Sequence, residues 1–332
     1  MNDARQDRSQ TLAPPRPLTF ELFAFRFRFR TLESLYLPPG KAGNVIRGTL
    51  GRIFRKFVCA PGCPGARTCG QRSVCAYARL FEPTAIAEGP SGLADWPRPF
   101  VIRAAHLDGR RFRPQEQFHF DLNVFEMRDP ALPYFAFSFS QLMRGGLGPG
   151  GGAAELTSVH SLDRAGQLGV QVFDGQIISQ PQPLTLSLEP EGSPVYRVRV
   201  QFLTPTELKA AGGIVSKPEF AVLFARVRDR INTLRQIYGQ GALPIDFVAL
   251  GQRARAVKLV QSDVRWETYE RRSGKTGQRH PLSGFVGWAE YEGDLTEFIP
   301  YLRAAYWTGV GRQTTWGKGH VEVRIGVEER SR

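Results

Sequence analysis

The chain has 332 residues, enough for two domains of ordinary size, and 42% of them are hydrophobic, which excludes wholesale disorder. It contains no run of about 18 apolar residues, so a transmembrane helix is excluded. The net charge of +13 comes mainly from arginine, because only seven of the 44 basic residues are lysine. Guanidinium groups suit phosphate and stack on bases, which favours RNA or DNA as partner. The alternative is an arginine-rich surface that is merely soluble.

Residues 1–17 are polar and lack the apolar core of a signal peptide. We interpret them as a disordered leader and expect a cytoplasmic protein with no membrane partner.

The first half of the chain predicts alternating strands and helices. In the strand at residues 18–31, phenylalanine at every second position alternates with mostly arginine, so one face is aromatic and the other basic. Apolar side chains then recur at helical spacing over residues 46–57. The next predicted elements are strands at 100–105 and 117–125, a helix at 132–143 and a strand at 156–162.

The second half repeats this pattern. Its predicted elements are a strand at 195–202, an amphipathic helix at 218–238, strands at 257–269 and 282–291, a helix at 295–307 and a strand at 321–327. Each half reads β-α-β-β-α-β, which predicts an α+β protein with tandem ferredoxin-like (RRM-like) domains and a C-terminal Gly-rich loop. We place the domains at 18–169 and 193–332, with a Gln- and Pro-rich linker at 170–192.

The Gly-rich loop, Gly309–Gly319, combines four glycines, two cations, two threonines and a tryptophan. Glycines let backbone N–H groups approach phosphate, hydroxyls and cations add contacts, and tryptophan can stack a base. The predicted RNA-binding residues are Gly309, Gly311, Arg312, Gln313, Thr314, Thr315, Trp316, Gly317, Lys318 and Gly319.

A polar basic loop joins the strand pair of the second half. Its predicted RNA contacts, mainly to phosphate, are Arg271, Arg272, Lys275, Arg279 and His280. The alternative is a mobile surface hairpin without such contacts.

All four cysteines of the chain, Cys59, Cys63, Cys69 and Cys75, fall within 17 residues, in an insertion at 58–80. Four thiolates can close on one tetrahedral ion, and zinc suits an all-cysteine set. Structural zinc is therefore the prediction, with an iron–sulfur cluster or free thiols as alternatives. A closed site of this kind leaves no position for catalysis.

Two parts of the chain resemble a known family. Gly284-Phe285-Val286-Gly287, the strand to Tyr291 and Gly309–Gly319 resemble the C-terminal signature of the CRISPR repeat-RNA processing endoribonucleases of the RAMP superfamily. The stretch Ile46–Gly51 and the cysteines running into Ala76–Phe81 are similar to a subgroup with an N-terminal four-cysteine cluster. The resemblance covers most of the chain after residue 18.

The resemblance implies binding of the repeat in precursor CRISPR RNA and its cleavage without a metal ion. The ribose 2′-hydroxyl attacks the adjacent phosphate, which needs a base, a cation and a proton donor. A histidine near the first helix often serves in the family, but this sequence has none there. The candidate catalytic residues are Tyr36, Lys41, Arg47 and Arg52, and the base is not identified.

The missing helix histidine leaves a second function open. The chain is then a non-catalytic subunit that holds the guide RNA end in an effector complex with other CRISPR subunits. A third hypothesis is a ferredoxin-like scaffold whose basic surface is incidental.

Overall fold

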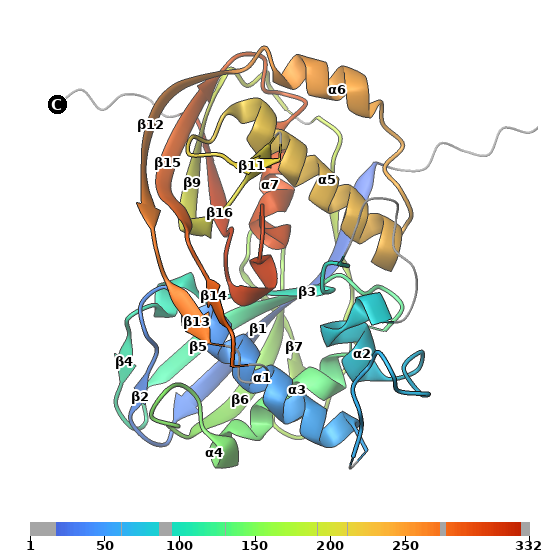
Figure 1. Cartoon of the computed structure of the whole chain (residues 1–332), viewed down its shortest axis with the longest axis vertical. Helices are drawn as coiled ribbons and strands as arrows, with labels where there is room; N and C mark the ends of the chain where they lie inside the picture. The colour runs from blue at the N-terminus through green and yellow to red at the C-terminus, as the bar shows by residue number, and fades with distance from the viewer. Residues whose placement is uncertain are drawn as a thin grey trace, which may run out of the picture.

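The computed structural model describes residues 18–60, 62–85, 95–129, 131–190, 192–210, 212–272 and 277–326. The predicted leader therefore lies outside the described residues. Two halves stack along the long axis, with the N-terminal half below and the C-terminal half above (Figure 1). Among the described residues, no helix combines the length and apolarity that crossing a bilayer requires.

The N-terminal half contains both helices and strands. Its helices are α1 (Ala42–Val58), α2 (Ala76–Phe81), α3 (Leu132–Ser140) and α4 (Leu142–Gly145), with 3-10 turns η1 (Pro83–Ala85) and η2 (Ala105–Leu107). Its strands are β1 (Thr19–Thr31), β2 (Leu35–Tyr36), β3 (Phe100–Arg103), β4 (Arg111–Phe112), β5 (Gln117–Val124), β6 (Ala154–Leu162), β7 (Leu168–Phe173) and β8 (Leu184–Ser187).

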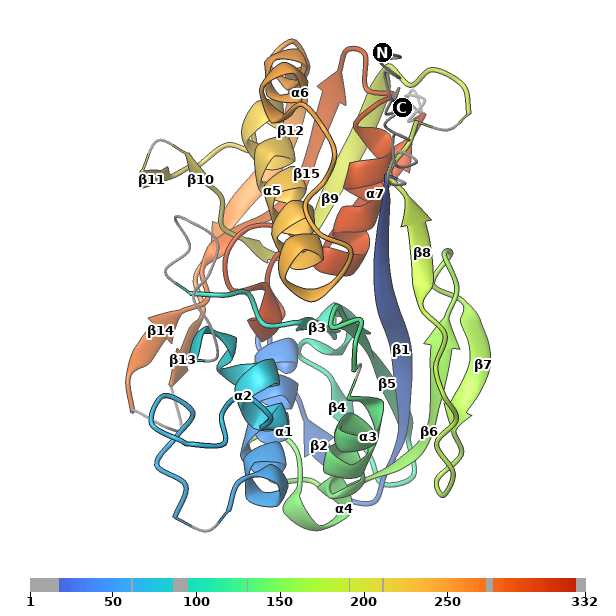
Figure 2. The ribbon, with the colours of Figure 1, turned by 90° about the vertical axis from the view of Figure 1, so that its right-hand side faces the viewer.

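Strand β1 is the centre of the N-terminal sheet, whose order is β3-β5-β1-β6-β7, with β8 also paired to β1. Its phenylalanines at positions 23, 25, 27 and 29 are buried beneath α1 and α3. The Phe27 ring lies 5.1 Å from Phe139 of α3 and 5.7 Å from Phe120 of β5. Helices α1, α2 and α3 lie on one side of β1, while β6, β7 and β8 extend the sheet (Figure 2). The arginines of β1 therefore point to the face without these helices.

The C-terminal half also mixes helices and strands. Its helices are α5 (Phe220–Tyr238), α6 (Phe247–Ala254) and α7 (Ile299–Thr308), with the 3-10 turn η3 (Thr314–Trp316). Its strands are β9 (Arg197–Thr206), β10 (Lys209–Ala210), β11 (Gly213–Ile214), β12 (Lys258–Glu267), β13 (Glu270–Arg272), β14 (Arg279–Pro281), β15 (Gly284–Glu292) and β16 (Val321–Ile325).

Each half has an antiparallel sheet with related strand order. The C-terminal sheet runs β12-β15-β9-β16, and the corresponding N-terminal strands run β3-β5-β1-β6. The prediction of a mixed α+β protein with antiparallel sheets is confirmed.

The segment 170–192, predicted as a linker, contains most of β7 and all of β8, so the N-terminal sheet extends into it. The predicted basic loop forms, in part, the β13–β14 hairpin.

The two halves share a buried contact. Phe20, Leu22 and Ala24 of β1 belong to the hydrophobic core that α5 and α7 build. The end of α7 points at the N-terminal sheet, where the Asn123 side-chain amide donates to the Trp307 carbonyl at 2.8 Å. Such bonds satisfy helix carbonyls that have no partner within the helix. The halves are therefore held together by both apolar and polar contacts.

The Gly-rich loop also crosses between the halves, because it follows α7 and packs on α1 (Figure 1). A Cβ placed on Gly43 of α1 would lie 2.8 Å from the Gly317 Cα, closer than real side chains approach backbone. Glycine is therefore required at position 43 for close contact.

Replacing Gly43 by alanine is expected to lower the free energy of unfolding by about 1–3 kcal/mol, because backbone must move apart. The matched control is Gly48→Ala in the same helix, where no atom lies within 4 Å of the new Cβ. That change is expected to raise stability by up to ~1 kcal/mol through helix propensity. Thermal unfolding of both variants checks this, and equal stabilisation by both would contradict the contact.

Candidate functional site

The Gly-rich loop is shaped by its contacts with protein backbone. A Cβ on Gly311 would lie 2.3 Å from the Glu207 carbonyl oxygen, and one on Gly319 would lie 2.0 Å from that of Val310. Both glycines also have positive φ, at 79° and 67°. Thr314 and Thr315, predicted to contact RNA, are buried.

The two cations of the Gly-rich loop have protein partners. Arg312 forms an ion pair with Glu207. The buried Lys318 ammonium donates to the Ser283 carbonyl at 2.6 Å and to the Gln313 amide oxygen at 2.9 Å. Burial lowers the pKa of Lys318 to about 8, and the nearby Glu207 carboxylate opposes this shift. Lys318 therefore holds the loop together through its hydrogen bonds.

Trp316 has a different setting, because the β13–β14 hairpin covers it. The Arg271 guanidinium lies 4.0 Å from the centre of the Trp316 ring, and the His280 ring lies 5.8 Å away. The structure thus brings three predicted RNA-binding residues into one stack, half-buried in each case. Cation–π stacking of this kind is also how proteins hold single-stranded bases.

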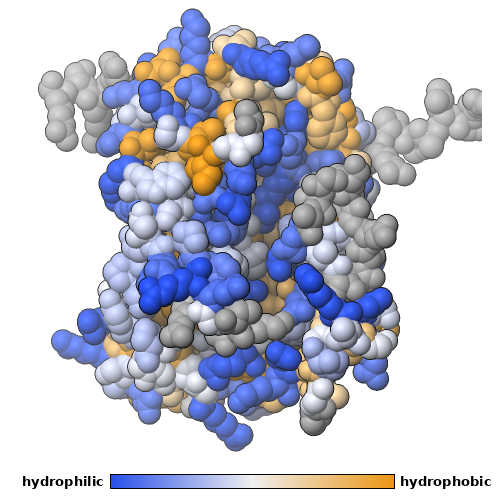
Figure 3. Space-filling model, viewed as in Figure 1, coloured by the Kyte–Doolittle hydropathy of each residue, from blue (hydrophilic) through white to orange (hydrophobic). Residues whose placement is uncertain are grey.

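The remaining hairpin residues are less defined. Arg279 pairs with Glu270 across the hairpin at 3.5 Å. Lys275 lies outside the described residues, and of Arg272 only the backbone is described. On the face shown in Figure 3, the surface around the junction of the halves is largely hydrophilic, whereas hydrophobic patches gather mainly on the C-terminal half.

The four predicted catalytic residues do not meet in one cluster. Arg47 is turned toward the Phe81 ring at 5.6 Å, and burial lowers its pKa to about 10. Tyr36 lies beneath the Arg111 guanidinium, 4.2 Å from the ring centre. Lys41 immediately precedes α1 and Arg52 lies eleven residues later, which separates them by roughly 16 Å along the helix axis.

Lys41 is the predicted catalytic residue beside the Gly-rich loop. It is the N-cap of α1, two residues before Gly43, which contacts Gly317. One carboxylate oxygen of Asp108 accepts the backbone N–H groups of Lys41 and Ala42 at 3.0 and 2.8 Å. The Lys41 backbone thus lies where the first helix, the Gly-rich loop and the segment after β3 meet.

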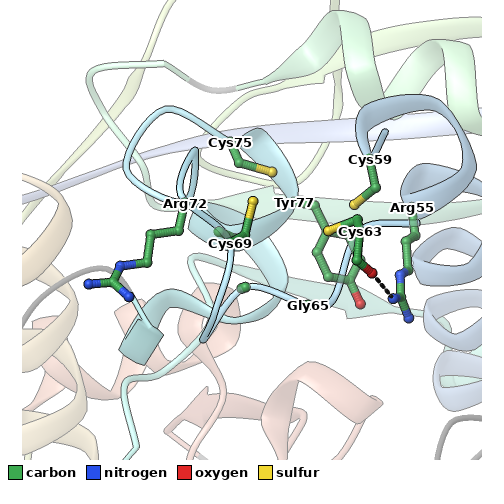
Figure 4. Close-up of a pocket in the computed structure, with 10 residues that line it drawn as sticks. Arg55, Cys59, Cys63, Gly65, Cys69, Arg72, Cys75 and Tyr77 are labelled. Atoms are coloured by element: carbon green, nitrogen blue, oxygen red, sulfur yellow. Dashed lines mark hydrogen bonds between the residues drawn. The ribbon is translucent and has the colours of Figure 1, made fainter. Parts of the chain in front are cut away.

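The cysteines surround a common pocket between α1 and α2. Cys59 and Cys63 face Cys69 and Cys75 across it (Figure 4). None of these four cysteines forms a disulfide. Burial, with the adjacent Cys63 sulfur, raises the pKa of Cys59 to about 11, whereas the Gly65 backbone N–H lowers that of Cys63.

This arrangement does not by itself form a metal site. No group of three or more His, Cys, Asp or Glu side chains within the described ranges has the positions of metal ligands. The zinc stays a prediction from the cysteine spacing.

Comparison with known proteins assigns the chain to a family. Residues 200–321, which include the β13–β14 hairpin and the whole Gly-rich loop, match the family model described as CRISPR-associated endoribonuclease Cas6. This chain belongs to the Cas6 family. Residues 18–184 match a second model, described only as an N-terminal domain. The Cas6 match confirms the resemblance seen in the C-terminal sequence; the four-cysteine subgroup stays a prediction.

Individual relatives are distant from this Cas6-family chain. An uncharacterized protein of Archaeoglobus fulgidus is 25% identical over 315 residues, covering 92% of this chain and all of the relative. Thermus thermophilus Cas6 has a similar fold, with a TM-score of 0.51 and 15% identity over 92% of this chain and 99% of its own. A Cas6 product complex has a TM-score of 0.52 at the same identity and coverage.

A larger assembly also contains this fold. A partial Cas6-RT-Cas1–Cas2 complex has a TM-score of 0.54 and 10% identity, with 94% of this chain and 47% of the other covered. At such identities the likeness concerns the fold alone.

Replacing Lys318 by methionine is expected to lower the free energy of unfolding by about 3 kcal/mol, because the Glu207 carboxylate loses a buried cation. The salt dependence of RNA binding is expected to stay unchanged. Arg271→Gln is the comparison: it is expected to reduce the slope of log K against log salt by about 0.7–0.9, as for one lost phosphate contact. A reduced slope for Lys318→Met with unchanged melting would contradict its structural role.

Proposed function

We propose that this Cas6-family chain binds the repeat of precursor CRISPR RNA and cuts it to mature guide RNAs without a metal ion. The observation that carries the proposal is the Trp316 stack, which lies inside the matched region and joins an aromatic ring to Arg271 and His280. An aromatic platform flanked by a guanidinium and an imidazole suits single-stranded RNA, whose bases stack while arginine contacts phosphate.

The arrangement of the two halves supports the same proposal. We interpret them as tandem ferredoxin-like domains, with the Gly-rich loop as the connection that sets α1 against the second domain. The net charge of +13 attracts single-stranded and double-stranded RNA alike. The Trp316 stack favours an unpaired segment of RNA.

The reaction we propose is attack of the ribose 2′-oxygen on the adjacent phosphorus, with departure of the 5′-oxygen. Lys41 is positioned to stabilise the charge that grows on the phosphate, because it borders the Gly-rich loop at the start of α1. Tyr36 and Arg52 remain candidates at a distance from it. Arg47, which is half-buried against the Phe81 ring, acts in this proposal by positioning α1 rather than by touching RNA.

Partners are proposed from the described relatives. Structures of similar fold include a Cas6 product complex and a Cas6-RT-Cas1–Cas2 complex. We infer that this chain takes CRISPR repeat RNA as its substrate and other CRISPR proteins as further partners.

Structural zinc is a separate proposal for the four cysteines. Thiolates are the ligands zinc prefers, and the backbone N–H of Gly65 already favours the ionised Cys63 sulfur. Four such ligands would close the site, so the metal would order the loop between α1 and α2 and take no part in cleavage.

The zinc proposal predicts about one zinc per purified chain by elemental analysis. Cys69→Ser is expected to lose the metal and several degrees of melting temperature, since the loop depends on it. Thr68→Ala, an exposed neighbour in the same loop, is the matched control and keeps both. Zinc far below one equivalent, with no visible absorbance, would indicate that the cysteines are free thiols. Visible absorbance would indicate an iron–sulfur cluster.

The function is tested with the cognate repeat RNA in chelator. Cleavage is expected, with a cyclic phosphate on one product and a 5′-hydroxyl on the other, and a single 2′-deoxy substitution at the cut site abolishes it. Tight binding without any cut product would favour the non-catalytic RNA-binding subunit. Failure to bind at moderate salt would contradict both functions.

A further inference from the structure

A row of basic and titratable side chains crosses the face of the N-terminal sheet opposite α1 and α3. In the register of β1 and β5, Arg28 lies directly opposite His119 and Arg26 opposite Asp121. Directly opposed side chains in a sheet have Cβ atoms about 4.5–5.5 Å apart. Arg28 and His119 are therefore immediate neighbours, contributed by strands about ninety residues apart.

A second histidine is stacked on the first. The turn η2 carries His106 over β5, where its ring lies 4.6 Å from that of His119 with 28° between the planes. Nε2 of His106 is 2.9 Å from the His119 backbone carbonyl, which only accepts, so Nε2 carries the proton. In the neutral ring Nδ1 then bears the free lone pair of a base.

The surroundings keep both imidazoles neutral at pH 7. Burial lowers the pKa of His119 to about 4, and His106, Arg26 and Arg28 add to the shift while Asp121 opposes it. Burial also lowers the pKa of His106, assisted by Arg26 and Arg110. An arriving phosphate would favour the protonated form of the nearer ring, as any anion does.

The two arginines beside this histidine pair differ in how tightly protein partners hold their guanidinium groups. Arg26 is held by Asp121 through two hydrogen bonds of 2.7 and 2.9 Å. The Arg28 guanidinium makes a long contact of 3.4 Å with the Gln117 amide oxygen. Arg28 also lines a shallow depression of about 420 Å³ on the same face, with Arg30 and Gln117. The depression has room for a phosphate beside Arg28, although the carboxylates of Glu155 and Asp174 also line it.

The pair also lies close to the start of α1. Asp108, which accepts the first backbone N–H groups of α1, follows His106 by two residues. The first helix carries no histidine, whereas the turn η2, whose backbone contacts this helix, carries His106. The sequence separation of His106 and His119 from α1 hides this proximity.

We propose that His106 and His119 are the general base and general acid of the cleavage, with Arg28 binding the scissile phosphate. This inference rests on the proposed endoribonuclease function. Nδ1 of His106 takes the proton of the 2′-hydroxyl as the 2′-oxygen bonds to phosphorus. The P–O5′ bond breaks, and His119, which takes up a proton from solvent when the phosphate binds beside it, gives that proton to the departing 5′-oxygen. The products are a 2′,3′-cyclic phosphate and a 5′-hydroxyl, with no water or metal consumed.

The test compares His106→Asn and His119→Asn in single-turnover cleavage of the repeat RNA. Each is expected to lower the rate constant by about 100-fold or more, the usual contribution of a general acid or base. Binding of the uncleavable 2′-deoxy repeat is expected to stay unchanged. His160→Asn, on β6 of the same sheet, is the matched control and keeps the wild-type rate.

A repeat with sulfur in place of the bridging 5′-oxygen separates the two roles. A thiolate leaves without protonation, so the sulfur substrate is expected to restore His119→Asn to within about tenfold of wild type. His106→Asn is expected to stay slow on both substrates. Restoration of neither variant, or of both, would overturn the assignment of acid and base.

Arg28→Ala provides a variant that leaves the stacked histidines and their backbone intact. It is expected to lower the cleavage rate by about 100-fold with an unchanged melting temperature. If wild type cuts the repeat and all three variants cut it equally fast, the proposed pair is wrong while the endoribonuclease function stands. If wild type itself does not cut, the proposed function fails first.

Discussion

The contact between Gly43 and Gly317 sets the relation between the two halves of this protein. Two backbones meet there without side chains between them, so the Gly-rich loop lies directly on the first turn of α1. Close backbone packing of this kind leaves little freedom to slide or rotate. The Trp316 stack, Lys41 and the capped helix N-terminus owe their relative positions to this contact.

Charge is divided between structural and functional uses within a few residues. Lys318 and Arg312 are engaged by Glu207, Ser283 and Gln313, and burial of the Lys318 ammonium makes its protein hydrogen bonds hard to exchange. Arg271 instead covers an aromatic ring at the surface. The distinction depends on burial, since a desolvated cation needs its protein partners whereas a half-exposed one can exchange them for phosphate.

Membership of the Cas6 family and the absence of a helix histidine are compatible in this fold. The sheet order β3-β5-β1-β6 places β1 between β5 and β6, so arginines of one strand lie beside histidines of another. The turn η2 then adds a second imidazole at the edge of the sheet. A sheet face can thus assemble a base, an acid and a cation that no single helix carries.

The sequence by itself determined the α+β class, the alternating face of β1 and the amphipathic α5, because strand and helix periodicity are local properties that burial then confirms. It also identified the family, through the motif at Gly284–Gly287 and the Gly-rich loop. Part of the predicted linker is paired strand, because β7 pairs with β6 and β8 pairs with β1, a strand far away in the chain.

Only the tertiary structure decided which charged side chains are buried among protein partners and which are accessible to a ligand. Lys318 and Arg271 look alike in sequence, yet one is buried by strands and loops distant from it and the other is not. The pairing of His106 with His119 was likewise invisible, because stacking depends on how η2 crosses β5. Both outcomes follow from contacts between segments far apart in the chain, which local patterns do not specify.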